Sequence, residues 1–196
     1  DQKQITDAVI QILSACIMTR GVKLNELATF DIEYLFLNVR SKSVGETIKL
    51  NLTCPDDEKT NVEVDIDLDS IKIKKDKSHT NTIKLDDNLS MKLKYPSMKQ
   101  FIESNFEAGV ENVSNTMEVI SSCIDMIYNE EESWSASDVT KKELDEFIDQ
   151  LNTKQFKLIE EFFDTMPKLS HKIKVKNPKT EVESTIILEG LAAFFN

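Results

Sequence analysis

Few residues in this chain of 196 residues could carry out chemistry. The two histidines are His79, in a polar segment, and His171, at the start of a predicted strand. An isolated histidine is usually a solvated side chain rather than a general base or a metal ligand. The sequence has no glycine-rich phosphate-binding motif, no nucleophile elbow and no H-E-x-x-H zinc motif, and it has only 4 glycines. We therefore predict no catalytic residue and a protein that is not an enzyme.

Two kinds of metal site can be considered, and the sequence favours neither. Asp65, Asp67 and Asp69 could offer oxygens to calcium, but their segment lacks the glycine and the distal glutamate of an EF-hand loop. Strand alternation would place all three on the solvent side of a sheet. Cys54 precedes Pro55 at a predicted hairpin turn, yet a tetrahedral zinc site needs four ligands and no Cys-x-x-Cys pair follows. We expect no metal and no cofactor.

One segment, Phe30 to Gly45, is the element on which the rest of the chain is expected to pack. Its apolar residues recur at helical spacing in two sets, Ile32, Leu35, Phe36 and Val39 and, on a second face, Tyr34 and Leu37. A helix that is apolar nearly all round belongs inside a fold. Arg40 and Lys42 suit the negative end of the helix dipole, and Gly45 is placed to end the helix.

The remaining periodicities predict an α+β fold in a single domain over residues 1–196. Further helices are expected over residues 1–18, 97–102, 112–128, 140–151 and 153–166. Ser97 and Thr153 are expected to cap the helices that they begin, and Thr140 and Glu143 fit a capping box. Period-two alternation marks β-rich parts at about residues 46–95 and 170–188, and we place their two X-Pro hairpins on one sheet. A further short hairpin is predicted across Asp87 and Asn88. The predicted architecture is a central buried helix, with a helical bundle region at about residues 97–167 packed against antiparallel β-hairpins.

Charge is distributed unevenly along the chain, whose net charge is −11. Residues 101–167 carry 16 acidic and 4 basic groups, a net charge of −12, whereas residues 1–100 carry 16 and 15 and residues 168–196 carry 3 and 5. So acidic a surface would repel phosphate backbones, which argues against nucleic-acid binding. It fits either a solvated helical face or a surface that docks onto a basic partner.

Two further features bear on the environment and the contacts of the protein. No apolar run approaches the ~18 residues of a membrane-spanning helix, and three scattered cysteines argue for a reducing compartment. The pairs Phe162–Phe163 and Phe194–Phe195 are hard to bury fully, so part of that set is a candidate contact patch.

A family resemblance is carried by the segment ATFDIEYLFLNVRSKSVGETI, which resembles part of the baseplate hub assembly proteins of T-even-type tailed bacteriophages. It consists of an acidic and aromatic start, an EYLFL-like run and the pattern R-x-K-S-V-G before a strand. Those positions are here Asp31, Glu33, Tyr34, Leu35, Phe36, Arg40, Lys42, Ser43, Val44 and Gly45. The ending LEGLAAFFN, Leu188 to Asn196, resembles the C-terminus of the same family, so the resemblance spans about residues 1–196.

The resemblance implies a non-enzymatic protein of phage tail morphogenesis, either a subunit of the baseplate hub or a chaperone of hub assembly. Its partners would be other baseplate hub and tail proteins, with self-association left open. It would work in the bacterial host cytoplasm during assembly, or in the virion tail baseplate. The candidate structural or partner residues are Tyr34, Phe36, Arg40, Lys42, Gly45, Phe162, Phe163, Phe194 and Phe195.

Two departures from the family pattern matter. Relatives often carry Cys-Pro-x-Cys knuckles at the two hairpin turns, whereas this chain keeps Cys54, Pro55 and Pro178 but has Asp57 and Asn177 where thiols would be expected. This argues against a metal-binding role. The family usually begins with an extra β-rich segment, which is absent here, as expected if it has been trimmed or is disordered. An alternative interpretation, resting on the acidic middle region, is an adaptor or inhibitor module that binds a basic host or phage protein.

Overall fold

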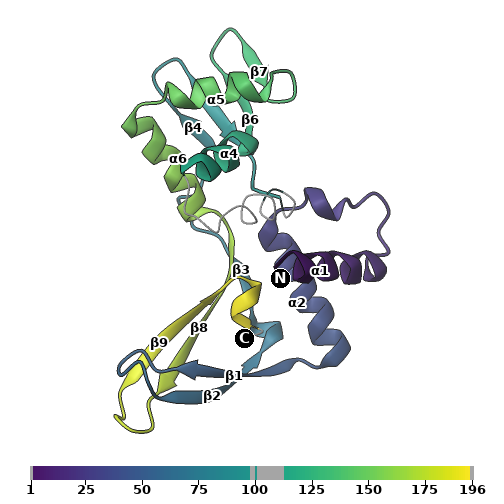
Figure 1. Ribbon diagram of the computed structural model, residues 1–196, viewed down its shortest axis with the longest axis vertical. Helices are drawn as coiled ribbons and strands as arrows, with labels where there is room; N and C mark the ends of the chain where they lie inside the picture. The colour runs from purple at the N-terminus through teal and green to yellow at the C-terminus, as the bar shows by residue number, and fades with distance from the viewer. Residues whose placement is uncertain (1, 98–99, 101–112, 195–196) are drawn as a thin grey trace. The chain divides into compact units, whose positions relative to one another are not determined.

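The computed structural model describes residues 2–97, 100 and 113–194 of the chain (Figure 1). They form two compact units. Unit 1 comprises Asp1–Ala8, Val22–Thr29 and Lys75–Met166, and unit 2 comprises Val9–Gly21, Phe30–Lys74 and Pro167–Asn196. Both combine helices with antiparallel strands, which confirms the α+β class. The expectation of a single domain stays a prediction.

Helix α2, Thr29–Val44, is the predicted helix, and it ends as predicted at Gly45, whose φ of 132° is open to glycine and strained for other residues. The helix is less buried than predicted, since its buried residues are Phe30, Ile32, Leu37 and Ser41. Of the stripe Ile32, Leu35, Phe36 and Val39, only Ile32 is buried. Leu37 is buried in the core of unit 2, and Tyr34 packs against that core. Ser41 is buried on the same face of α2 as Leu37. Because serine is polar, a pattern of apolar residues does not include it.

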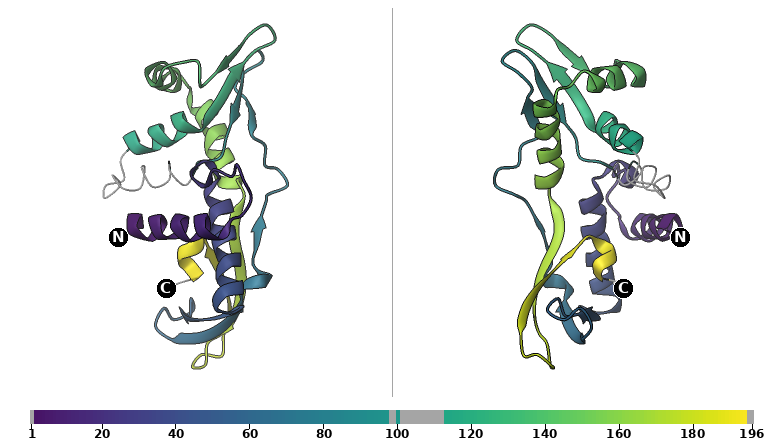
Figure 2. Two further views of the ribbon diagram at one scale, coloured as in Figure 1. Left: turned by 90° about the vertical axis from the view of Figure 1, so that its right-hand side faces the viewer. Right: turned by 60° about the vertical axis from the view of Figure 1, so that its left-hand side comes forward.

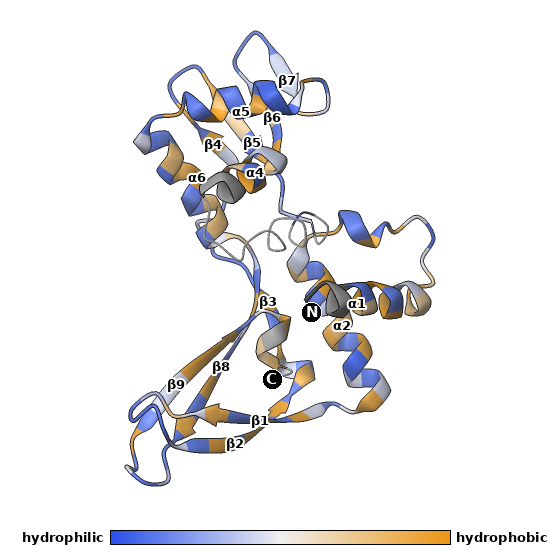
Figure 3. Ribbon diagram, in the orientation of Figure 1, coloured by the Kyte–Doolittle hydropathy of each residue, from blue (hydrophilic) through white to orange (hydrophobic). Residues whose placement is uncertain are grey.

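Unit 2 contains two sheets built from hairpins. Strands β1, Thr47–Thr53, and β2, Asn61–Asp67, pair only with each other, and a 3-10 turn, η2, follows at Leu68–Ser70. A three-stranded sheet of order β3-β8-β9 consists of Lys72–Lys74, Lys168–Lys176 and Glu183–Glu189. A last 3-10 turn, η3, covers Leu191–Phe194. Figure 3 shows the alternation of hydrophobic and hydrophilic residues along these strands, which gives each sheet one core-facing side.

The prediction that the two hairpins share one sheet is wrong. Strand β3 takes the free edge of β8, with Ile73 opposite Leu169, so that edge is closed to β1 and β2. The two sheets instead share a hydrophobic core. Its buried members are Leu37, Ile48, Leu50, Ile66, Leu68, Ile71, Leu169, Ile173, Val175, Leu188 and Phe194. Apolar side chains from both hairpins are thus removed from water together without backbone pairing between the hairpins.

Unit 1 is a four-stranded antiparallel sheet with helices on one face (Figures 1 and 2). The sheet order is β4-β5-β6-β7, and the strands are Thr82–Lys84, Ser90–Leu93, Ile124–Tyr128 and Ser133–Ser135. The helices are α4, Val113–Cys123, α5, Lys141–Asp149, and α6, Thr153–Thr165. The predicted β4–β5 hairpin and the capping box of Thr140 and Glu143 at the start of α5 are both confirmed. Asn152, rather than Thr153, caps α6.

The prediction of one helix over residues 112–128 is wrong from Ile124 onward, where the chain becomes strand β6. Ile124 and Ile127 are both buried, three residues apart, which imitates helical spacing. The register between β5 and β6 shifts at Lys92 and Leu93, and this irregularity inserts Asp125 into β6. An extra residue changes the spacing of same-face residues from two to three. A bulged strand therefore gave the helical pattern.

Helix α1, Gln2–Cys16, confirms the first predicted helix, and a short 3-10 turn, η1, follows at Leu24–Glu26. The predicted cap at Ser97 is made with Gln100, because the Gln100 amide donates to Ser97 Oγ and the Ser97 amide donates to Gln100 Oε1. The rest of the helix predicted over residues 97–102 lies outside the described residues. In the part of the chain that the structure describes, no helix is both long and apolar enough to cross a membrane.

Candidate functional site

Hydrogen bonds and an ion pair connect the C-terminal end of α2 to the η2 turn. Ser41 Oγ donates a hydrogen bond of 2.7 Å to Asp69 Oδ1, and Lys42 Nζ lies 2.6 Å from Asp69 Oδ2. Lys42 Nζ also lies 2.8 Å from Glu46 Oε1. Hydrogen bonds from Lys42 and Ser41 hold the pKa of the Asp69 carboxyl below its ordinary value. The basic residues of this segment therefore have intramolecular partners and position the helix.

The middle of α2 is joined to the C-terminal segment through Glu33. Its Oε1 accepts a hydrogen bond of 3.0 Å from the backbone N–H of Leu191, the first residue of η3, which lies beside α2 in Figure 2. Gly190 has a φ of 71°, and a Cβ added there would lie 3.3 Å from Glu33 Oε1. Burial raises the pKa of Glu33, and the Leu191 N–H opposes that shift. The two segments that carry the family resemblance thus meet at one carboxylate.

The other candidate residues of α2 have local or packing roles. Arg40 Nη1 donates a 3.2 Å hydrogen bond to the carbonyl oxygen of Gly45 and so closes the end of the helix. Tyr34 is half-buried against the core of unit 2, and its backbone oxygen accepts a hydrogen bond from Asn38. Phe36 is half-buried.

The phenylalanine pairs are divided between cores and surface. Phe162 is 2% exposed in unit 1, and Phe194 is 1% exposed in unit 2. Phe163 is half-buried and meets Phe162 edge to face, with ring centroids 5.1 Å apart. Phe195 lies outside the described residues. The partner role suggested for these residues stays a prediction, and the burial of Phe162 and Phe194 gives both side chains a place in hydrophobic cores.

The two hairpin turns of unit 2 share two backbone features. Glu58 N donates to Cys54 O at 3.0 Å, and Glu181 N donates to Asn177 O at 2.9 Å. Both glutamates have positive φ, 53° and 61°. The two sequence segments that looked alike, each with an X-Pro turn, therefore form turns that begin with the same type of backbone hydrogen bond.

A polar clasp joins these turns, and we call Asp56, Asn177 and Thr180 the tip clasp. Asn177 Nδ2 donates to both carboxylate oxygens of Asp56, at 3.1 and 3.0 Å, and Thr180 Oγ1 donates to Asp56 Oδ2. The Thr180 and Asn177 hydrogen bonds lower the pKa of Asp56, and burial raises the pKa of the neighbouring Cys54 thiol. Among the described residues, no three His, Cys, Asp or Glu side chains are grouped to hold a metal ion.

His79 is half-buried in an aromatic cluster of unit 1, and it is not the exposed side chain that its polar segment suggested. Its ring lies against Tyr95 and Phe162, with centroid distances of 5.6 and 5.2 Å. Thr165 Oγ1 donates to Glu161 O, so it accepts from His79 Nδ1–H at 2.9 Å, and His79 Nε2 then accepts from the Tyr95 hydroxyl at 3.0 Å. Burial lowers the pKa of His79. The imidazole is a neutral structural group.

The remaining acidic and histidine candidates lie on strands and turns. Asp65 and Asp67 are exposed on β2, as the alternation predicted, whereas β2 ends at Asp67 and Asp69 belongs to η2. Asp67 accepts a hydrogen bond from the Asp69 amide and so caps that turn. His171 lies in β8, opposite Leu188 of β9.

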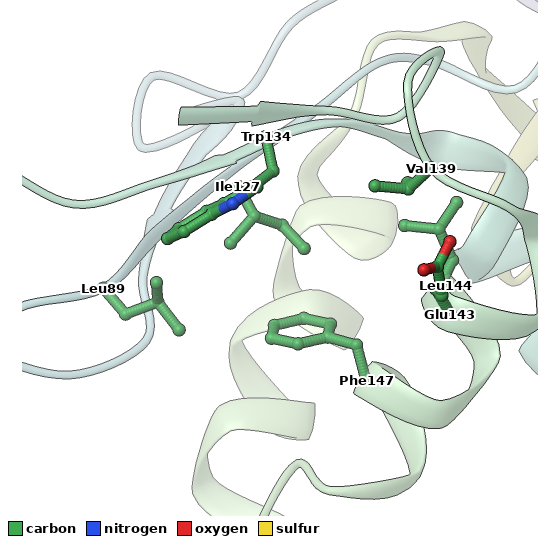
Figure 4. Close-up of a pocket in the computed structure, with 7 residues that line it drawn as sticks. All are labelled: Leu89, Ile127, Trp134, Val139, Glu143, Leu144 and Phe147. Carbon is green, nitrogen blue, oxygen red and sulfur yellow. The ribbon is translucent and has the colours of Figure 1, made fainter. Parts of the chain in front are cut away.

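A pocket that the sequence reasoning missed lies in unit 1, between the outer strand β7 and helix α5 (Figure 4). Its volume is about 320 Å³, and its lining is almost entirely apolar: Leu89, Ile127, Trp134, Val139, Glu143, Leu144 and Phe147. The acidic, serine-rich composition of residues 130–137 predicts a link that contains Trp134, whereas the structure places this residue in β7. The alternation of Ser133, Trp134 and Ser135, which is typical of a strand, is the signal that could have placed this side chain on a sheet face.

The comparisons with known proteins agree with the family expectation at a coarser level. The family described as T4 bacteriophage base plate protein matches residues 1–196. Searches of the curated proteins and of the solved structures find no match. Because the match covers the whole chain, the chain belongs to the T4 bacteriophage base plate protein family.

Proposed function

We propose that this baseplate-family chain is a non-enzymatic tail assembly protein that acts through protein–protein contacts, as a subunit of the baseplate hub or as a chaperone of hub assembly. The observation that carries the hub assignment is the bond between Glu33 and Leu191, which lie 158 residues apart. It joins the two segments by which the chain resembles hub assembly proteins. The resemblance therefore describes one folded unit rather than two unconnected stretches.

The location and the partners follow from the same proposal. The protein binds other hub and tail proteins in the host cytoplasm during assembly, with or without forming a homo-oligomer, and a hub subunit then stays in the virion tail baseplate. Two polar groups support a structural role, because the His79 ring is hydrogen-bonded to Thr165 and Tyr95 and Asp56 joins two turns.

Co-expression with the hub and tail proteins of the same phage tests the proposal. We expect a stable complex with at least one of them by size-exclusion chromatography. Failure to bind any tail component would overturn the assignment. Mass spectrometry of purified virions then separates the two roles, since a subunit is present at a fixed copy number and a chaperone is lost from the finished particle.

The second candidate is an acidic adaptor or inhibitor module that binds a basic host or phage protein. It is supported by the net charge of −12 over residues 101–167 and by the exposed run Glu130–Glu132. Binding dominated by exposed charges weakens steeply as salt rises. Tight, salt-sensitive binding to a basic protein that is not a tail component favours this candidate, and an affinity independent of salt excludes it.

A further inference from the structure

The pocket of unit 1 has the form of a receptor for a single large side chain. Ile127 and Trp134 are directly opposite each other on β6 and β7 and form its sheet side, and Leu144 and Phe147 form its helix side (Figure 4). Trp134 is 40% exposed, so a large apolar surface faces water at the pocket. An engineered cavity of ~150 Å³ binds benzene. A pocket of about 320 Å³ therefore has room for an aromatic or branched aliphatic side chain.

The segment that supplies most of the pocket's lining residues is acidic. Residues 130–149, which contain β7, the following loop and α5, carry 8 acidic and 2 basic groups, a net charge of −6. Glu131 and Glu132 are exposed in the turn just before β7, where their backbone amides donate to Asn129 Oδ1 at 2.8 and 2.7 Å and so hold the turn. The two basic groups, Lys141 and Lys142, each pair with a glutamate. The excess of carboxylates favours a cationic ligand.

We propose that this pocket receives one large apolar side chain from a lysine- or arginine-rich segment of another baseplate protein. The proposal rests on the proposed function for its partner and adds the contact surface. The apolar anchor covers Trp134, Leu144 and Phe147, and the flanking basic residues meet the carboxylates of the turn before β7 and of α5. Binding buries the exposed Trp134 side chain and also brings opposite charges together. The apolar anchor and the charges are therefore two separate contributions to affinity.

The test starts from the tail protein that binds the full chain in co-expression. Its sequence is scanned with overlapping, fluorescein-labelled peptides of about 12 residues that lack tryptophan, and binding is measured by anisotropy. Because the chain has 1 tryptophan, blue-shifted emission of Trp134 reports occupancy of the pocket. We expect the binding peptides to be basic, to contain a large apolar residue, and to lose affinity between low and high salt.

Variants locate the contact and separate anchor from charge. We expect Trp134→Ala to weaken peptide and whole-protein binding by about tenfold or more, as for a buried interface anchor. The double variant Glu131→Lys/Glu132→Lys should weaken binding and remove most of its salt dependence. The matched control is Glu160→Lys/Asp164→Lys, which makes the same charge change at exposed positions of α6 and should change affinity by less than about twofold. Circular dichroism of each variant checks that it is folded.

Several outcomes would overturn the inference, and they are distinguishable from failure of the proposed function. If a tail protein binds but the pocket variants bind it as the wild type does, the pocket inference is wrong and the proposed function stands. If the pocket variants abolish self-association measured by ultracentrifugation and leave partner binding unchanged, the occupant is a second copy and the inference is wrong. If no tail protein binds the chain, the proposed function fails and the inference fails with it.

Discussion

The hydrogen bond between Glu33 and Leu191 gives the sharpest prediction about stability. Glu33→Ala removes the acceptor of a half-buried N–H, and an unsatisfied donor costs about 1–3 kcal/mol. Since Leu191 is only half-buried, we expect the lower part of that range, about 1–2 kcal/mol. For a chain of this size each kcal/mol lowers Tm by about 2–4 °C, so the expected decrease is about 2–8 °C.

Glu33→Gln separates the hydrogen bond from the charge, because the amide oxygen still accepts from Leu191 N–H. Burial raises the pKa of Glu33 above its ordinary value of 4.5. The folded protein therefore binds this proton more tightly than the unfolded chain, and wild-type stability decreases as the pH rises through the folded pKa. The Gln variant has no such loss. Its stability relative to wild type should increase from about pH 4 upward until Glu33 is fully ionised.

Urea unfolding of wild type, Glu33→Gln and Glu33→Ala at several pH values between about 4 and 8 measures these differences. Asp31, whose pKa burial also raises, is common to all three and cancels in the comparison. Glu189→Gln, at an exposed position of β9, controls for the loss of one negative charge. A difference between wild type and Glu33→Gln that does not change with pH, or that favours wild type as pH rises, would refute the reasoning.

Three other predictions concern single side chains. Gly190→Ala should destabilise the protein by about 1–2 kcal/mol because its φ is positive. A further loss is expected because the new Cβ would lie close to the carboxylate oxygen of Glu33. Gly21→Ala is the control in thermal unfolding, because Gly21 has a φ of 85° with open space around it and has only the first cost. Ser41→Ala should cost about 1 kcal/mol for a lost buried hydrogen bond, whereas Ser43→Ala on the exposed side of the helix should leave Tm unchanged. For His79, ¹⁵N NMR should show the Nδ1–H tautomer and a pKa below 6.5. Because the unfolded chain then binds this proton more tightly, the contribution of His79 to stability decreases as pH falls below 6.5. An imidazole that titrates above 6.5 would contradict this prediction.

Local sequence patterns were sufficient where neighbouring residues decide the structure. The start of α5 was predictable because Thr140 and Glu143 satisfy each other's backbone amides within one turn. The end of α2 was predictable because Gly45 takes a backbone conformation that side chains disfavour. The hairpin turns at Cys54 and Asn177 were recognisable from a shared X-Pro pattern. The family resemblance was equally local, since it rested on two short segments.

Periodicity failed where a partner strand or a buried polar group changed its meaning. Ile124 and Ile127 looked helical because Asp125 is an inserted residue, and only the pairing with β5 reveals the insertion. Ser41 sits on the core-facing side of α2 because Asp69 accepts its hydrogen bond, and an apolar pattern cannot include a serine. The grouping of Trp134 with α5 likewise depends on where β7 is placed in its sheet.

The sequence alone determined the start of α5, the end of α2, the two X-Pro hairpins, the acidic middle of the chain and the family, because each depends on residues close together along the backbone. The tertiary structure decided which residues share a site. Glu33 bonds with Leu191, Asp56 bonds with Asn177, and Trp134 and Phe147 line one pocket only after folding. Burial of apolar surface brings the distant segments together without regard to direction, and the polar groups carried with them must then find partners. Those partners follow from the packing, which local spacing does not contain.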